Sequence, residues 1–145
     1  MTHTDDIRWK QRFYNFRRAF TLLQSAFADN NVDDFSDLEK EGVIQRFEYT
    51  YELGWKTFRD YLEFSGIQEE STPRRVIKKC AAAGIFQEAD INPEIFLDMM
   101  LTRNALSHTY DFEQFNQAIE KIQQLYLAEL EKTYMFFISK ELEDE

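Results

Sequence analysis

The sequence predicts an all-α protein: a single helical-bundle domain of residues 1–145, folded as an up-and-down bundle of about five helices, three long and two short. Three observations predict this class. Hydrophobic residues recur at alternating intervals of three and four, as on one face of an α-helix. The chain holds only four Gly and two Pro, too few for the many turns of a β fold. No run alternates Val, Ile or Thr with polar residues in the manner of a strand.

Two long helices are expected in the first half of the chain. The first covers residues 6–28, and its stripe consists of Trp9, Phe13, Phe16, Phe20, Leu23 and Phe27. The second begins near Asp37, because "SDLE" (36–39) has the form of a capping box, and it ends before Gly66, a residue suited to a left-handed helix end. Its stripe consists of Ile44, Phe47, Tyr51, Gly54, Trp55, Phe58 and Leu62.

Two short helices and a third long helix are expected in the second half. The short ones open with Thr72–Pro73 and Asn92–Pro93, each a capping residue followed by a proline, and Gly84 ends the first of them. Its inner face consists of Val76, Ile77, Cys80 and Ala81. The last helix opens at "DFEQ" (111–114) and reaches about residue 140. Its inner face consists of Phe115, Ile119, Ile122, Tyr126 and Leu130 or Tyr134.

Composition excludes several classes of protein. The formal net charge of −10 disfavours non-specific binding of a polyanion over the whole surface, although "RWKQRFYNFRR" and "RRVIKK" are locally basic. A single cysteine, Cys80, allows no internal disulfide and, with two distant histidines, forms no recognisable zinc site. No signal peptide or membrane span is apparent, so we expect a soluble, cytoplasmic protein that needs no cofactor or metal of its own.

The octapeptide "RNALSHTY" (103–110) is the candidate functional motif. Arg103 can bind phosphate oxygens with its planar fork, and His108 can exchange protons near neutral pH. Five residues on a straight helix place these two side chains about 140° apart. They converge only if the helix ends near Ser107, or if two copies of the segment meet across a two-fold axis.

Two interpretations of this motif remain open. Arg103, Asn104, His108 and Tyr110 could cleave RNA without a metal, by activating the ribose 2′-hydroxyl and stabilising the crowded phosphate. Alternatively, Arg103 and His108 simply cap the carbonyl end of a helix and complement its dipole.

Two further surfaces also allow two interpretations each. Glu48 and Glu52 flank Trp55 on the second helix, either as a rim that contacts a partner or ligand or as a solvated face with a Glu52–Lys56 ion pair. The basic run "RRVIKK" (74–79) is either a phosphate-binding patch or an ordinary helix surface.

Three sequence blocks resemble the HEPN-domain proteins of the HepT-like group. "RNALSHTY" resembles the Arg-x4-His-x-Tyr motif of that group, "RFEYTYELGWKTFRDYLE" resembles its second-helix signature, and "PRRVIKKCAAAGIF" with "MMLTRN" resembles its middle. The similarity covers nearly the whole chain and includes small bacterial proteins described as nucleotidyltransferase substrate-binding subunits.

The resemblance implies a two-fold homodimer with the motif in a composite cleft. It also implies a partner, a minimal nucleotidyltransferase that forms a complex with this chain. By position, Arg103 is then the phosphate-binding cation, His108 the acid/base and Asn104 a supporting polar residue. Tyr110 is the residue to which the partner, using ATP, would transfer AMP.

Two functions follow from the resemblance. The first is a metal-independent ribonuclease toxin of a toxin–antitoxin pair, which the nucleotidyltransferase silences by AMP transfer. The second is a non-catalytic subunit that binds the nucleotide or substrate of a two-chain nucleotidyltransferase.

Overall fold

The computed structural model describes residues 4–28, 30–67, 72–108 and 111–143, and every regular element in these ranges is helical. Two long helices are α1 (Thr4–Ala28) and α2 (Asp37–Phe64). A third consists of α6 (Phe112–Lys121), the π-helical turn η2 (Ile122–Tyr126) and α7 (Leu127–Glu143). The short elements are the 3₁₀ turn η1 (Val32–Asp34), α3 (Pro73–Ala82), α4 (Ile85–Ala89) and α5 (Pro93–Leu106). The predicted all-α class is confirmed.

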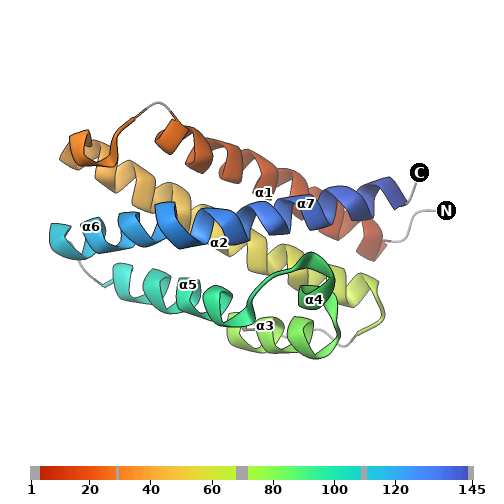
Figure 1. Ribbon diagram of the computed structural model, residues 1–145. Helices are drawn as coiled ribbons and strands as arrows, with labels where there is room; N and C mark the ends of the chain where they lie inside the picture. Colours follow the sequence, from red (N-terminus) through yellow and green to blue (C-terminus); the bar gives the residue numbers. More distant parts are fainter. Residues whose placement is uncertain (1–3, 29, 68–71, 109–110, 144–145) are drawn as a thin grey trace.

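The first two helices pack as an antiparallel pair, and the last helix crosses over α2 (Figure 1). α2 begins at the predicted capping box, in which the Ser36 hydroxyl accepts from the Glu39 N–H at 3.1 Å and the Glu39 carboxylate accepts from the Ser36 N–H at 2.9 Å. The predicted stripe of α1 is buried except for Phe27, which is half-buried. At Gly54 the backbone of α2 comes so close to α1 that an added Cβ would lie 3.2 Å from the Phe16 ring.

The two predicted short helices form a layer against α2, but a third short helix, α4, was not predicted. Gly84 with φ of 82° and Asp90 with φ of 60° stand on either side of α4, so the chain turns sharply before and after it. Five residues are too few to show a helical period. α4 nevertheless contributes to the core, because the Phe86 ring lies 5.0 Å from Phe58 and 5.5 Å from Phe96.

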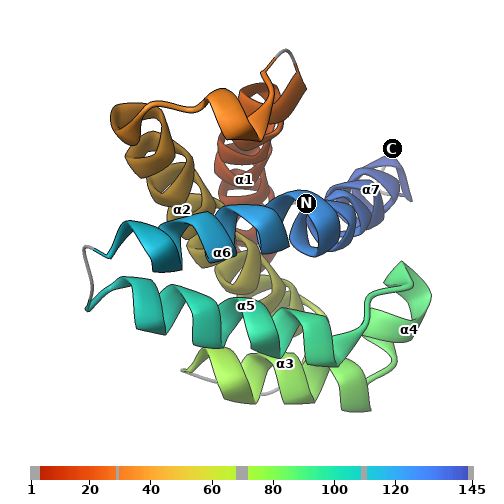
Figure 2. The same cartoon turned by 60° about the vertical axis from the view of Figure 1, so that its left-hand side comes forward.

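The last helix runs without a break across the molecule, as predicted, but it contains the unpredicted π-helical turn (Figure 2). Tyr126 ends this turn and is fully buried, with its ring stacked 5.4 Å from Phe47. Its hydroxyl donates to Asp98 of α5 at 2.5 Å and lies 2.8 Å from the Thr102 hydroxyl. The π turn therefore ties the last helix to α5, the helix that carries the motif.

The aromatic side chains are mostly accounted for within one chain. Among the described aromatic residues, only Tyr14 and Tyr49 are largely exposed. The abundance of aromatics therefore gives no argument for a dimer, and the predicted two-fold dimer stays a prediction. In the part of the chain that the structure describes, no helix is long and apolar enough to cross a lipid bilayer.

Candidate functional site

The motif spans the end of α5 and the turn after it. α5 ends at Leu106, one of the two conditions under which the motif side chains could converge. Ser107 donates both its N–H, at 3.2 Å, and its hydroxyl, at 3.0 Å, to the carbonyl of Arg103. The N–H of His108 donates to the carbonyl of Ala105 at 3.3 Å, so the chain tightens into a turn that leaves His108 exposed. Asn104 is exposed on the last turn of α5, and Tyr110 lies outside the described residues.

Arg103 reaches across to α2. Its guanidinium lies 3.7 Å from a carboxylate oxygen of Glu52, and both side chains are about one third exposed. Glu52 also lies 3.3 Å from Lys56, the ion pair expected from their spacing. Within the described residues, no hydrogen bond joins the Arg103 guanidinium to the last carbonyls of α5. Arg103 stands in the last turn of the helix, so its charge complements the helix dipole without capping these carbonyls. Its Nε is buried and has no hydrogen-bond partner.

Glu48 and His108 line one groove, although they come from different helices. This motif groove has a volume of about 760 Å³. It is lined by Glu41, Ile44, Gln45 and Glu48 of α2, by Leu106, Ser107 and His108 at the end of α5, and by Phe115 of α6. A carboxylate and an imidazole on the same groove form a possible pair for proton transfer.

Glu48 also links this groove to Arg103. Burial raises the pKa of the Glu48 carboxyl above its ordinary value, and the positive charge of Arg103 opposes part of that rise. Arg103 itself does not line the groove. Glu48 thus shares a groove with His108 and interacts electrostatically with Arg103, which lies outside the lining of that groove. Sequence analysis placed Glu48 on a rim and did not predict this link between the two motif residues.

Trp55, the third residue of the predicted rim, is buried, with only 5% of its surface exposed. The Arg59 guanidinium lies 5.4 Å from the centre of its ring and the Lys56 ammonium 5.9 Å. Its Nε1 and the hydroxyl of Tyr51, one turn earlier, are buried without a hydrogen-bond partner. Trp55 therefore forms no part of an exposed rim, and the cations of Lys56 and Arg59 lie against its ring.

Tyr51 is the residue of this edge that sequence analysis assigned to the core alone. Burial, followed by the negative charge of Glu52, raises the pKa of its hydroxyl, while Arg103 opposes the rise. The hydroxyl therefore stays protonated at neutral pH and is a donor without an acceptor. The signal in the sequence was a tyrosine, Tyr51, that lies on the hydrophobic stripe directly before Glu52.

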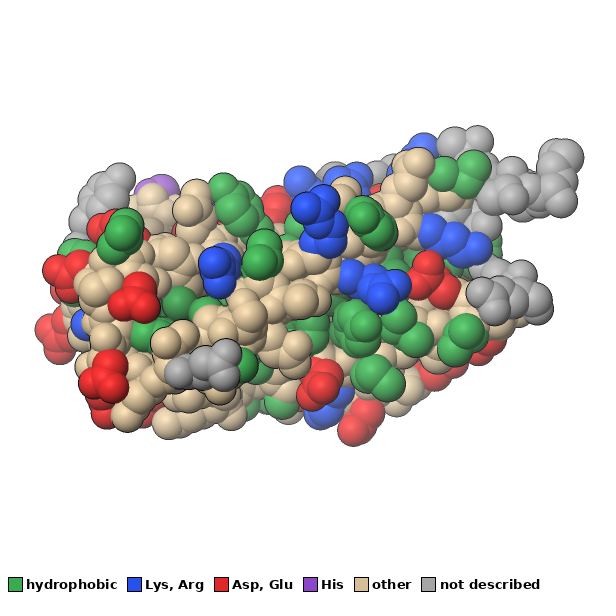
Figure 3. All heavy atoms as spheres, turned by 90° about the horizontal axis from the view of Figure 1, so that it is seen from above, with side chains coloured by type: hydrophobic (Ala, Val, Ile, Leu, Met, Phe, Trp, Pro, Cys, Tyr) green, Lys and Arg blue, Asp and Glu red, His purple; other side chains and the backbone are tan. Residues whose placement is uncertain are grey.

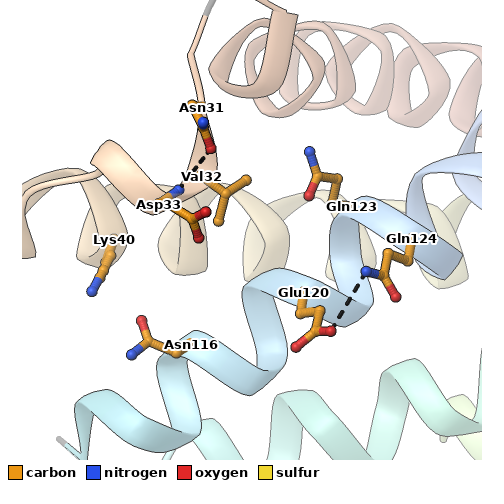
Figure 4. A pocket seen from close by; sticks show the side chains of 8 residues that line it. All are labelled: Asn31, Val32, Asp33, Lys40, Asn116, Glu120, Gln123 and Gln124. Atoms are coloured by element: carbon orange, nitrogen blue, oxygen red, sulfur yellow. Dashed lines mark hydrogen bonds between the residues drawn. The ribbon is translucent and has the colours of Figure 1, made fainter.

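A second polar pocket lies away from the motif, between η1, the start of α2 and the last helix (Figure 4). Its volume is about 670 Å³. The lining consists of Asn31, Val32, Asp33, Lys40, Asn116, Glu120, Gln123 and Gln124. Asn31 and Glu120 are engaged locally, with the Asp33 N–H and the Gln124 amide. The π turn supplies two of the amides, and no sequence signal indicated this pocket.

Other potentially reactive groups are buried or scattered. Cys80 is buried as expected, and burial raises the pKa of its thiol, so the thiolate is disfavoured. Among the described residues there is no group of three His, Cys, Asp or Glu side chains that could hold a metal ion.

Comparisons with known proteins add a family to this geometry. Residues 11–137 match the profile of a family described as "nucleotidyltransferase substrate binding protein like". The crystal structure of a protein from Thermus thermophilus is similar, with a TM-score of 0.67 and 28% sequence identity. The similarity covers 81% of this chain and 94% of that one. The comparison with curated proteins found no match.

Proposed function

The chain belongs to the family of nucleotidyltransferase substrate-binding-like proteins, and from this premise we propose that it is a ribonuclease that acts beside a nucleotidyltransferase partner. The observation that carries the proposal is the motif groove, in which Glu48 and His108 face the same space while Glu48 interacts with Arg103. A base, an acid and a phosphate-binding cation are thus gathered at the junction of α2 and α5.

The proposed reaction is transfer of a phosphodiester to the neighbouring ribose hydroxyl. The 2′-oxygen forms a bond to phosphorus, and the bond from phosphorus to the 5′-oxygen breaks. Glu48 accepts the proton of the 2′-hydroxyl, because its raised pKa makes it a stronger base than an ordinary carboxylate. The imidazolium of His108 gives a proton to the leaving 5′-oxygen. The products are a 2′,3′-cyclic phosphate and a 5′-hydroxyl.

Arg103 stabilises the negative charge that grows on the phosphate oxygens during this attack. It must first exchange its partner Glu52 for the phosphate. Because the pair is 3.7 Å long and about one third exposed, breaking it costs at most about 1 kcal/mol. The buried Nε, which lacks an acceptor, gains one when the phosphate binds.

We propose, as the resemblance to the HepT-like group implies, that the partner silences the enzyme at Tyr110, two residues after His108. In this step the Tyr110 oxygen attacks the α-phosphorus of ATP held by the nucleotidyltransferase, and pyrophosphate leaves. The attached AMP would bring a phosphate to Arg103 and a bulky base to the groove. A two-fold dimer through this region would set the Arg103 of one copy near the His108 of the other, and Asn104 would support the pair.

The test uses the full chain, purified free of its partner and free of AMP, with a labelled single-stranded RNA in the presence of EDTA. We expect cleavage that leaves a 2′,3′-cyclic phosphate, and none from His108→Ala. Asn116→Ala, a polar change in the second pocket, which shares no lining residue with the motif groove, is the matched control and should cleave normally. Wild-type protein that leaves all RNA intact would refute the ribonuclease.

A second candidate is a non-catalytic subunit that binds the substrate of the nucleotidyltransferase. It is favoured by the description of the family, whose members are like nucleotidyltransferase substrate-binding proteins, and in this role too Arg103 would exchange Glu52 for a ligand anion. The two candidates separate in a mixture of both chains with ATP. The toxin pair should place AMP on Tyr110 and stop RNA cleavage. The subunit should leave Tyr110 free and pass the nucleotide to a third molecule.

A further inference from the structure

The chain has two basic stretches, one on α1 and one on α3, and they differ in how many of their cations form ion pairs. On α1, Arg8 lies 2.7 Å from Glu63, Arg12 lies 3.1 Å from Asp60, and Arg17 lies 4.0 Å from Glu141. Figure 3 shows the resulting surface, on which basic side chains stand among acidic and hydrophobic ones. Ion pairs within the molecule thus neutralise much of the positive charge of α1.

The cations of α3 have no such partners. Arg74, Arg75 and Lys78 are exposed, and within the described ranges none of them forms an ion pair or a side-chain hydrogen bond. The opposite face of α3, formed by Val76, Ile77 and Cys80, is buried and fixes these cations on the outer surface. We call the outer surface of Arg74, Arg75 and Lys78 the α3 basic face.

This arrangement works against the stability of α3. α2, α5 and α6 each have acidic residues in their first turn, whereas α3 has none and carries Arg74 and Arg75 there. Positive charge at a helix N-terminus opposes the helix dipole, and like charges three or four residues apart, such as Arg74 and Lys78, repel. A cluster that breaks these local rules without a compensating partner among the described residues is typical of a functional surface.

The composition of this face favours a phosphate backbone over a protein partner. Protein interfaces usually have an apolar or aromatic centre. None of the exposed large hydrophobic side chains in the described part of the chain lies on α3. Arginine forks and a lysine spaced one helical turn apart match a row of phosphates, which bind mainly through charge.

The start of α3 lies toward the motif end of α5 (Figures 1 and 2). α3 packs along α5 and runs in the opposite direction, so the end with Arg74 and Arg75 is the end nearer to the C-terminus of α5 (Figures 1 and 2). A strand with one phosphate at Arg103 could therefore extend over the start of α3.

We propose that the α3 basic face binds the phosphate backbone of the RNA strand whose reacting phosphate lies at Arg103. The inference rests on the proposed function for the identity of the strand. It assigns to Arg74, Arg75 and Lys78 a share of the affinity and no part in the chemistry. Short substrates that end at the motif groove do not reach this face.

The experiment measures binding of a labelled single-stranded 20-nucleotide RNA to full-length His108→Ala protein over a range of salt concentrations. Loss of three phosphate contacts lowers the slope of log affinity against log salt by about 2, at about 0.7 for each contact with a single strand. We expect this change when Arg74→Gln, Arg75→Gln and Lys78→Gln are combined. In the background that retains His108, the triple variant should cleave a dinucleotide at the wild-type rate.

Single charge reversals supply a matched comparison. Arg74→Glu and Arg18→Glu change the net charge equally, and both side chains are exposed and without partners among the described residues. Only Arg74→Glu should weaken binding substantially. Equal effects of the two reversals, or an unchanged salt slope in a triple variant with normal thermal unfolding, would overturn the proposal.

Two further outcomes separate this inference from its premises. If the wild type cleaves nothing but its RNA affinity depends on α3, the ribonuclease fails and the binding face stands. If the triple variant no longer binds the nucleotidyltransferase but keeps its affinity for RNA, the α3 basic face is a protein interface and the inference fails.

Discussion

The two sides of α2 show how one helix serves packing and chemistry. The side toward α1 is buried and close-packed, and at Gly54 an added methyl group would lie 3.2 Å from the Phe16 ring, so that the ring would have to shift. The edge toward the end of α5 carries Glu48 and Glu52 above Tyr51, with polar atoms that lack partners. The packed side fixes the position of the edge, and the edge keeps unsatisfied groups that a ligand can satisfy.

Among the changes that test this comparison, Arg103→Ala, at the edge that faces α5, should have the largest effect. Removal of a charge stabiliser from a reacting phosphate lowers the cleavage rate by roughly two to three orders of magnitude. The free energy of unfolding should change by less than about 1 kcal/mol, since the lost ion pair is partly exposed. Cleavage assays and urea denaturation check the two effects separately. A variant that loses stability and activity in proportion would show that Arg103 is structural.

A substitution on the packed side should mainly change the free energy of unfolding. Gly54→Val forces a branched side chain against the buried Phe16 ring and should lower the free energy of unfolding by about 1–3 kcal/mol. Gly42→Ala, in the same helix but with open space around it, should raise it by about 0.5–1 kcal/mol. Thermal and urea unfolding measure both. Equal effects at the two glycines would mean that the close approach of α1 and α2 is not tight.

Tyr51→Phe tests whether the edge holds an unsatisfied donor. Its hydroxyl is buried without a partner, so removing it should raise the free energy of unfolding by about 1 kcal/mol. Tyr126→Phe is the matched control: it removes a hydroxyl bonded to Asp98 and leaves an unpaired acceptor, so it should lower the free energy of unfolding by about 1–3 kcal/mol. Destabilisation by Tyr51→Phe would instead reveal an acceptor for its hydroxyl in solution.

The smallest effect concerns pH. The pKa of Glu48 is raised above its ordinary value of 4.5 in the folded state, so the folded protein binds this proton more tightly than the unfolded chain. The contribution of Glu48 to stability is therefore present below pH 4.5 and is lost as pH rises through the raised pKa. The free energy of unfolding of the wild type minus that of Glu48→Gln should decline as the pH rises from 4 to 7. A flat difference would show that burial does not shift this carboxyl.

The helix boundaries were predictable where local chemistry sets them. Ser36, Thr72, Asn92 and Asp111 each cap a helix that begins at the next residue, as their sequence positions predicted. α4 was missed because its five residues are held by the two left-handed turns and by packing of Phe86, which are properties of the tertiary structure. The π turn was missed because the hydrophobic stripe continues through it.

The arrangement of the candidate site could not be predicted from the sequence, and the roles of its residues stay predictions. Arg103 and His108 were identified from their chemistry, but the pairing of Arg103 with Glu52 depends on how α5 crosses α2. The same packing lets Glu48 share a groove with His108 and interact electrostatically with Arg103. Spacing along one helix contains no information about the angle at which another helix packs against it.

The π turn decides where the last helix can change its length. It holds one residue more than a regular α-helical turn, so deletion of one residue from 122–126 would let the segment close as a regular α-helix. The residues after the deletion would then keep nearly the same rotation about the helix axis, and Phe136 and Phe137 would stay buried against Phe58. Deletion of one residue from the regular part of α7 before Phe136 would instead turn these two rings by about 100° and move them away from the core. Descendants that lose a single codon from this helix should therefore lose it at the π turn.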